Sequence, residues 1–418
     1  MMWRTEIKIA DFVRPSDLLI WSQGTAEPRT LTRALVEQRA DVHGVNVMLG
    51  VHYSDTFGPE HADHINFSGF GGYGTNARLS KAGVLEVIPA HISRTPSLIR
   101  SGALPVDVVF VQVSPADADG THRLGLAADY LQAAIARARV VVAEVNPAVP
   151  RTEGETVLRP DQIDFTVEAA EPPLELPGSA LSATERSIGE YVAERIADGA
   201  VLQFGIGTIP DAVCAALAGK HDLGIHSGMI GDGVLDLIEA GAVSNRTKQV
   251  DRGVSVAGVL FGTKRLYDYA DRNPAIELRS IDHTHAHAVM SSFDAYVSIQ
   301  SAVEIDLTGQ VNAETLNGVH VGAVGGANDF VRGAAASPHG HAITALRSTT
   351  TSGTISRIVP KLNDGVVTTP RSDVDLVVTE YGVAELYGRS LRQRAESLIA
   401  IAHPDFRDSL REAAERLC

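Results

Sequence analysis

The feature that most constrains the fold is a regular alternation of short apolar runs with helical patterns. Four runs in the N-terminal part of the chain are rich in Val and Ile: DLLIWS, VNVMLGV, VDVVFVQV and ARVVVAEV. Runs that are apolar on both faces are typical of strands in a parallel sheet that is covered on both sides. The stretch DYLQAAIARA between the last two has helical spacing, which predicts a right-handed strand–helix–strand unit. The sequence therefore predicts an α/β fold.

Two such alternating regions are separated by a stretch of different composition. Residues 151–182 are rich in proline and acidic residues and contain one strand candidate, IDFTVEA. Residues 183–200 then have the apolar spacing of a helix. The alternation resumes with the strand candidates AVLQFGIG, SVAGVLFG, AYVSIQSAVEIDL, HAITALRS, ISRIVPKL and VDLVVTEYG. We therefore predict an N-terminal lobe over residues 1–182 and a C-terminal lobe over residues 183–418.

Charge and composition exclude several classes of partner. The formal net charge of -15 argues against nucleic acid or an anionic membrane surface as a partner. No apolar run approaches the roughly 18 residues that a membrane span needs, and the N-terminal segment lacks the apolar core of a signal peptide. We therefore expect a cytoplasmic protein. Cys214 and Cys418 are too few to build a disulfide framework or a metal cluster.

A glycine turn in the C-terminal lobe is the first candidate ligand site. The segment GIGTIP, residues 205–210, follows a strand candidate and begins a helix. Its glycines let the backbone approach a ligand closely, Thr208 can cap the helix, and Pro210 fits the first turn. Unpaired N–H groups at such a helix start suit a phosphate or pyrophosphate. The alternative is a plain turn between strand and helix, because the motif is neither a dinucleotide-binding signature nor a P-loop.

Two further segments carry groups that are suited to catalysis. VGAVGGANDF, residues 321–330, can aim successive N–H groups at one point, as an oxyanion hole requires, or can be a flexible turn. In SAVEIDLTGQVNAET, residues 301–315, a strand would place Glu304 and Asp306 on one face. Paired acids of this kind can do acid–base chemistry, or they can hold a neighbouring turn.

The segment DHTHAHA places three histidines at alternate positions: His283, His285 and His287. On a strand all three would face the same side, where they could bind zinc. Metal sites usually draw their ligands from separate elements. We therefore expect no metal here, and a polar rim instead.

Taken together, these motifs resemble the acetyl-CoA hydrolase/transferase family, and within it the 4-hydroxybutyrate CoA-transferases. The resemblance covers roughly residues 15–410, in the family's order. The blocks that carry it are LPVDVVFVQVSPADADG, VVAEVNPAVPRT, GIGTIPDAV, SGMIGDGVLDLIEAGAVSN, GTKRLYDY, EIDLTGQVNAET, VGGANDFVRGA, GTISRIVP, VVTEYGVAELYGRSLRQRA and IAHPDF.

The resemblance implies two open, mostly parallel-sheet α/β lobes with the active site in the cleft between them, in a homodimer or homotetramer. It implies an acyl-CoA substrate, no permanently bound cofactor, and ping-pong transfer of CoA between carboxylic acids through a glutamyl-CoA thioester. Gly326 matches a backbone donor to the oxyanion, and the loop SGFGGYGT would supply a second N–H. The residues at the family's CoA-contact positions are Gly205, Ile206, Gly207, Thr208, Ile209, Val303 and Gly326.

The position that matches the family's nucleophilic glutamate is Gly228. The family block resembles HSEM or HTEM, whereas this chain has HSGM, and the following IGDG also differs from the usual ISDG or FSDG. Glycine has no side chain that could form an acyl anhydride or a thioester. Ordinary CoA transfer through residue 228 is therefore excluded.

Three hypotheses follow from the missing glutamate. Water or another small nucleophile uses the vacated space, which gives hydrolysis or direct acyl transfer, and this is the function we predict. Alternatively, another acid replaces the glutamate in a CoA-transferase, with Glu304 and Asp232 as candidates, although Asp232 can equally be the N-cap of the next helix. The third hypothesis is a protein that binds acyl-CoA without turnover.

Overall fold

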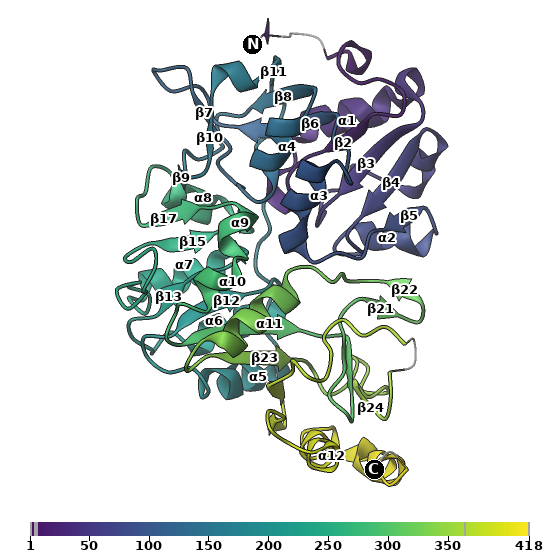
Figure 1. Cartoon of the computed structure of the whole chain (residues 1–418), viewed down its shortest axis with the longest axis vertical. Coiled ribbons are helices and arrows are strands. Elements are labelled where there is room, and N and C mark those ends of the chain that lie inside the picture. Colours follow the sequence, from purple (N-terminus) through teal and green to yellow (C-terminus); the bar gives the residue numbers. More distant parts are fainter. Residues whose placement is uncertain (1, 4–6, 363–364, 417–418) are drawn as a thin grey trace. The chain divides into compact units, whose positions relative to one another are not determined.

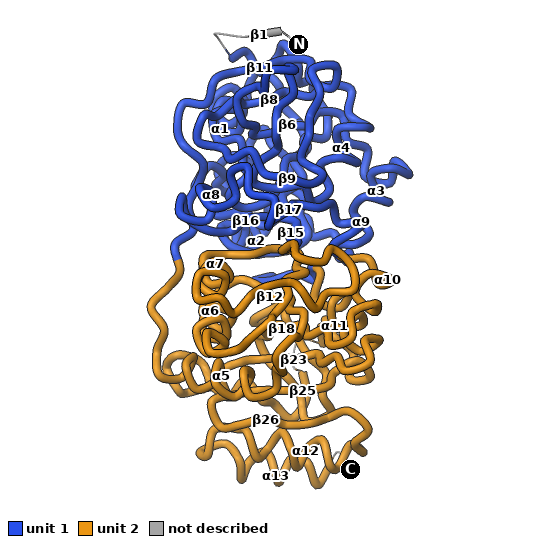
Figure 2. Tube along the Cα trace, turned by 90° about the vertical axis from the view of Figure 1, so that its left-hand side faces the viewer, with its two compact units in different colours: residues 1–177, 256–284, 319–325 blue, residues 178–255, 285–318, 326–418 orange. Residues whose placement is uncertain are grey.

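The structure is a computed structural model that describes residues 2–3, 7–362 and 365–416 (Figure 1). The chain forms two compact units, each assembled from separate stretches (Figure 2). Unit 1 comprises residues 1–177, 256–284 and 319–325, and unit 2 comprises residues 178–255, 285–318 and 326–418. The first boundary lies in the proline-rich stretch, whereas the division into two continuous domains at residue 182 stays a prediction. Cys418 lies outside the described residues.

A parallel sheet forms the core of unit 1, in the strand order β1, β11, β8, β6, β2, β3, β4, β5. These strands are β1 (Met2–Trp3), β2 (Leu18–Ile20), β3 (Val45–Leu49), β4 (Ile65–Gly69), β5 (Leu85–Val87), β6 (Val108–Val113), β8 (Val140–Val145) and β11 (Phe165–Glu168). The four apolar runs of the N-terminal region are therefore strands, as predicted. The helix α4 (Leu131–Arg137) connects β6 to the parallel strand β8, which confirms the strand–helix–strand unit.

Apolar residues on both faces explain why these strands are central. Every residue of β6 is buried. Val108 and Phe110 belong to one core cluster, while Val109 and Val111 belong to another. Because alternate side chains of a strand point to opposite faces, the sheet carries a core on each side. The remaining strands and helices of unit 1 are β7 (His122–Arg123), β9 (Glu153–Gly154), β10 (Val157–Leu158), most of β15 (Ser255–Ala257), β16 (Val259–Leu260), β17 (Ile276–Leu278), β22 (Val319–His320), α1 (Arg29–Glu37), α2 (Asn76–Lys81), α3 (Thr95–Ser101), α8 (Lys264–Ala270) and α9 (Ile281–Thr284).

A second, mostly parallel sheet organises unit 2. Strands β12 (Val201–Phe204), β18 (Tyr296–Ser301), β23 (His341–Ala345) and β25 (Leu376–Thr379) lie side by side and parallel in this order (Figure 2). β13 (Gly224–Ile225) pairs parallel with β12, while β14 (Met229–Ile230) and β26 (Gly382–Glu385) are antiparallel to β12 and β25. The other elements are β19 (Glu304–Asp306), β20 (Val311–Asn312), β21 (Thr315–Leu316), β24 (Ile358–Val359), α5 (Ala183–Ala193), α6 (Thr208–Ala216), α7 (Asp232–Glu239), α10 (His287–Met290), α11 (Ala327–Ala336), α12 (Leu391–Ala400) and α13 (Arg407–Ala414). Both units are therefore of the predicted α/β class.

The parallel order of unit 2 brings three loops to one edge of its sheet. The carboxyl ends of β12, β18 and β23 are neighbours, so the segments that follow them meet there. The crevice outside the carboxyl ends of parallel strands is where open α/β sheets bind ligands. In the part of the chain that the structure describes, no helix is both long and apolar enough to cross a membrane.

Candidate active site

A cavity of about 410 Å³ opens at this edge of unit 2. Residues 206–209 follow β12, Ser301 and Ala302 lie at the end of β18, and Leu346 and Arg347 follow β23. The other residues that line the cavity are Ala180, Ser182, Glu185, Thr351 and Arg357. The structure therefore brings the predicted glycine turn together with two arginines that the sequence analysis did not single out.

The glycine turn has a backbone conformation that only glycine adopts readily. Gly207 has φ 113° and ψ -178° and is the N-cap of α6. A Cβ atom at this position would have no neighbour within 4 Å, so the requirement for glycine comes from the backbone and not from crowding. Thr208 is the first residue of the helix, and its side chain makes no capping bond, which corrects the prediction that Thr208 caps α6. The first residues of the helix thus line the cavity, and N–H groups at a helix start suit an anion.

One of the two arginines is bound to a buried acid. The guanidinium of Arg347 forms an ion pair with Glu185, in which Nε donates over 2.6 Å. Ser182, the N-cap of α5, donates its backbone N–H to Glu185 over 2.9 Å. Burial acts to raise the pKa of Glu185, but the hydrogen bonds from Ser182 and Arg347 outweigh it and hold the pKa below its usual value.

The other arginine retains an unused donor. Nη1 of Arg357 donates to the carbonyl oxygen of Val303 over 2.9 Å, whereas its buried Nε has no hydrogen-bond partner among the described residues. Burial lowers the pKa of Arg357, and the positive charge of Arg347 lowers it further, while Glu304 acts in the opposite direction. A buried cationic donor without a partner is costly, and an anionic ligand in the cavity would satisfy it.

Gly228 lies beside the glycine turn because its segment pairs with β12. Met229 pairs with Phe204, the residue that directly precedes Gly205. The hydroxyl of Ser227 accepts from the N–H of Phe204 over 3.2 Å and donates to the carbonyl of Met229 over 2.6 Å. These bonds fix residue 228 at the end of the strand that leads into the cavity. Residue 228 therefore lies close to the start of the glycine turn, while its correspondence to the family's nucleophile stays a prediction.

The space next to Gly228 is filled by an imidazole ring. A Cβ atom at Gly228 would lie 2.9 Å from Cε1 and 3.1 Å from Nε2 of His285, and 3.2 Å from Cζ of Phe330. The rings of His285 and Phe330 pack at a centroid distance of 4.4 Å. His285 is buried, and burial lowers its pKa to about 3, so the ring is neutral near pH 7.

The same imidazole contacts the predicted oxyanion donor. Gly326 is the N-cap of α11, and a Cβ atom there would lie 2.6 Å from Nε2 of His285. Gly228 and Gly326 thus both pack against the side chain of His285. In unit 1, the SGFGGYGT loop already uses one of its N–H groups, because Gly72 donates to the carbonyl of Gly322 over 2.9 Å.

The two candidate replacement acids have other partners. Glu304 lies on β19, where it accepts from the side chain of Asn312 over 3.2 Å. Asp232 is the first residue of α7, whose N-cap is Gly231, so the suggestion that Asp232 caps this helix is wrong. The three atoms closest to a Cβ at Gly228 belong to His285 and Phe330, and none belongs to either acid. Asp306 holds a turn, as the alternative interpretation of the acid pair proposed, by accepting from the backbone N–H groups of Thr308 and Gln310.

The three histidines do not lie on a strand. His283 is in the helix α9, His287 begins the helix α10, and His285 lies between them. The prediction that they share one face of a strand is therefore wrong, because alternate spacing has this consequence only in an extended backbone. The absence of a metal at these residues stays a prediction. The role of His285 beside Gly228 was missed because no sequence spacing connects two residues that meet through tertiary packing.

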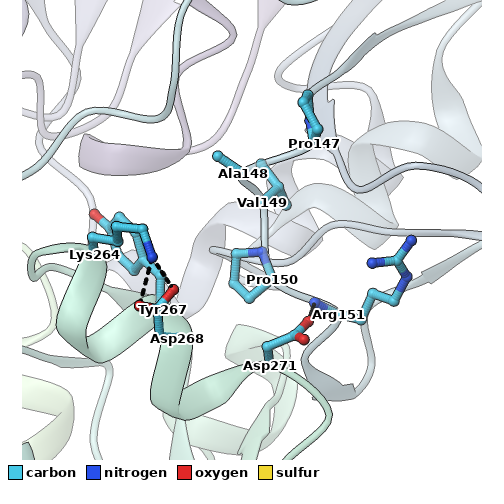
Figure 3. Close-up of a pocket in the computed structure, with 9 residues that line it drawn as sticks. All are labelled: Pro147, Ala148, Val149, Pro150, Arg151, Lys264, Tyr267, Asp268 and Asp271. Atoms are coloured by element: carbon cyan, nitrogen blue, oxygen red, sulfur yellow. Dashed lines mark hydrogen bonds and ion pairs between the residues drawn. The ribbon is translucent and has the colours of Figure 1, made fainter.

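A second cavity, of about 470 Å³, lies in unit 1 between the segment after β8 and α8 (Figure 3). Its charged groups are already paired within the chain: Lys264 with Asp268 over 2.6 Å, and Arg151 with Asp117 over 3.0 Å. Asp271 accepts from the backbone N–H of Arg151 over 2.7 Å. Because these charges are satisfied, the cavity of unit 2, with its unpaired Arg357 donor, is the better candidate site.

Comparisons with known proteins agree over nearly the whole chain. Family models for the acetyl-CoA hydrolase/transferase N-terminal and C-terminal domains match residues 3–175 and 262–414. The chain is 42% identical to the 4-hydroxybutyrate coenzyme A transferase of Clostridium kluyveri, covering 94% of this chain and 92% of that protein. It is 39% identical to the succinyl-CoA:cyclohexane-1-carboxylate CoA transferase of Geobacter metallireducens, covering 98% of this chain and 94% of that protein.

A solved structure shows the same fold. RipA from Yersinia pestis superposes with a TM-score of 0.92 at 34% identity, covering 97% of this chain and 95% of RipA. The sequence comparisons and the structural comparison thus indicate the same family as the order of the motifs. The chain is an enzyme of the acetyl-CoA hydrolase/transferase family.

Proposed function

We propose that this enzyme cleaves an acyl-CoA thioester without a glutamyl-CoA intermediate, by hydrolysis or by direct transfer of the acyl group to a small acceptor. The observation that carries the proposal is the residue at position 228. It lies beside the glycine turn, where a nucleophile would be needed, and it is a glycine. No covalent intermediate can form on a residue without a side chain.

The proposed CoA site is the cavity of unit 2. The turn at Gly205, Ile206, Gly207, Thr208 and Ile209 offers N–H groups at a helix start, which suit the phosphates or the amide groups of CoA. Arg357, bound to the carbonyl of Val303, adds a cationic donor. Coenzyme A enters here as part of the substrate, and the proposal requires no permanently bound cofactor. Gly326 contributes a backbone N–H to the oxyanion.

The decisive experiment incubates the purified protein with acetyl-CoA and no acceptor. Release of free thiol, followed with a thiol reagent, is expected. Intact-mass spectrometry during turnover should show no CoA adduct on the protein. Thiol release with no adduct supports the proposal, and an adduct mapped to Glu304 or Asp232 contradicts it.

The alternative function is a CoA-transferase that uses Glu304 as a replacement acid. One observation favours it: Glu304 acts on the pKa of Arg357, which lines the cavity. In that case acetyl-CoA alone would release no thiol, and addition of propionate would yield propionyl-CoA. We also propose a homodimer or homotetramer, which light scattering coupled to gel filtration can test.

A further inference from the structure

The imidazole of His285 occupies the place that opens when residue 228 has no side chain. The atoms nearest to a Cβ at Gly228 include Cε1 and Nε2 of His285, and those nearest to a Cβ at Gly326 are Nε2 and Cδ2. The Nε2 edge of the ring therefore faces both glycines. Both glycines are partly exposed, and the His285 side of this contact is 9% exposed.

Three contacts hold the ring in this orientation. Phe330 packs against it with an angle of 43° between the ring planes. Gly228 and Gly326 are each close enough that any larger residue would displace it. Phe330 and Gly326 both belong to the start of α11, and Gly228 is fixed to β12. The ring thus lies between the start of α11 and Gly228, the residue before β14.

We propose that His285 is the general base of the reaction and deprotonates the water that attacks the thioester. This inference rests on the proposed function in its hydrolytic form. It goes beyond that function because it assigns a catalytic group where the glutamate is missing.

The step balances with water as the only co-reactant. The lone pair of Nε2 takes a proton from water, and the water oxygen forms a bond to the carbonyl carbon. The carbonyl electrons move to the oxygen, which the N–H of Gly326 stabilises. When the tetrahedral intermediate collapses, the C–S bond breaks and the imidazolium returns its proton to the sulfur of CoA. The products are free CoA and a carboxylic acid, which loses its proton to solvent.

The environment of the ring is compatible with this role. Burial keeps the imidazole neutral, so the ring is in the form that can accept a proton at neutral pH. A weakly basic group needs a compensating charge in the transition state, and the developing oxyanion beside it provides one, because a nearby negative charge stabilises the imidazolium. General base catalysis of this type contributes roughly 100-fold to 10,000-fold to a rate.

The test compares four proteins with acetyl-CoA as substrate: wild type, His285→Phe, His285→Ala and His287→Ala. His285→Phe keeps a ring against Phe330 but removes the nitrogen. Its kcat for thiol release is expected to fall roughly 100-fold or more, while KM changes little. His287→Ala is the matched control, because His287 is exposed and lies only two residues away, and it should retain the wild-type rate.

Chemical rescue distinguishes a base from a structural side chain. His285→Ala leaves a cavity, and added imidazole should restore thiol release in proportion to its concentration. Wild-type rates in both His285 variants would overturn this inference alone and leave the proposed function standing. If the wild type itself releases no thiol from acetyl-CoA, the hydrolytic form of the proposed function fails, and the base role fails with it.

Discussion

The imidazole of His285 leaves no room for a side chain at Gly228: a Cβ atom at position 228 would lie only 2.9 Å from Cε1 of His285. The φ angle of Gly228 is not in the left-handed region, so its backbone conformation is compatible with a larger residue. The side chains that a larger residue at this position would meet first are therefore His285 and the Phe330 ring on which it packs. This has a direct consequence for restoring the family's nucleophile.

We predict that Gly228→Glu alone forms little glutamyl-CoA, whereas Gly228→Glu combined with His285→Ala forms it readily. Removing the imidazole frees the space that the glutamate needs beside the glycine turn. Proximity of a well-placed nucleophile can supply roughly 7–11 kcal/mol of a barrier. Intact-mass spectrometry after incubation with acetyl-CoA, with borohydride trapping, detects and locates the adduct. An equal adduct in the single variant would show that His285 is no obstacle.

Gly207 should be essential for CoA binding because of its backbone angle. Its φ of 113° lies in a region that costs other residues about 1–3 kcal/mol, so Gly207→Ala should raise the Kd for CoA about tenfold. Gly219→Ala is the matched control, since Gly219 also has open space around it but no positive φ. Isothermal titration calorimetry measures both. Unchanged affinity in folded Gly207→Ala would mean that CoA does not use this turn.

Arg357 should matter for the ligand and not for the fold. Arg357→Gln removes both the buried Nε without a partner and the hydrogen bond from Nη1 to Val303, so the two effects offset each other and the free energy of unfolding should change little. The Kd for CoA should rise about tenfold or more, because a charge-assisted hydrogen bond contributes about 1.5–3 kcal/mol. Arg392→Gln, at an exposed site of α12, serves as the control for charge. A variant that unfolds more easily and binds CoA normally would reverse this assignment.

Glu144 should make the stability of the protein depend on pH. Burial raises its pKa from 4.5 to about 7, although the N–H of Leu31 donates to it over 3.1 Å. Because the pKa is raised on folding, its stabilising contribution is complete below pH 4.5 and is lost as the pH rises through about 7. Urea unfolding should therefore show Glu144→Gln gaining about 3 kcal/mol relative to wild type between pH 4.5 and pH 8. A difference that stays constant across this range would contradict the assignment.

The sequence was informative where local pattern and structure have the same cause. Val108 to Val113 form a buried strand because the run is apolar on both faces apart from Gln112, and this short apolar run was enough to predict it. The glycine turn was likewise predicted from Gly205 and Gly207. The residue that caps the helix was not predicted correctly. The N-cap is Gly207, with a positive φ and no side-chain hydrogen bond, and Thr208 is the first residue of the helix.

The interior of the candidate site could not be predicted, because it is made by distant parts of the chain. His285 meets Gly228 and Gly326 through tertiary packing, in which α11 lies against α10 and β18, and no periodicity links these positions. The alternate histidines suggested an extended strand, yet the short helices α9 and α10 form there. Arg347 follows β23 and Arg357 lies in the block GTISRIVP, but nothing in the sequence indicates that both side chains line one cavity.

The discontinuous composition of unit 1 determines when it can be completed during synthesis. Its strand β9 pairs with β17, and Gly72 donates to Gly322, so early residues depend on partners that the ribosome adds much later. At roughly 5–20 residues per second, on the order of ten seconds separate residue 177 from residue 325. The main sheet of unit 1 can form from residues 2–168. Strand β9 and the N–H of Gly72, however, stay without these partners while part of unit 2 is being made, and such an unpaired strand is what a chaperone that binds exposed strands recognises.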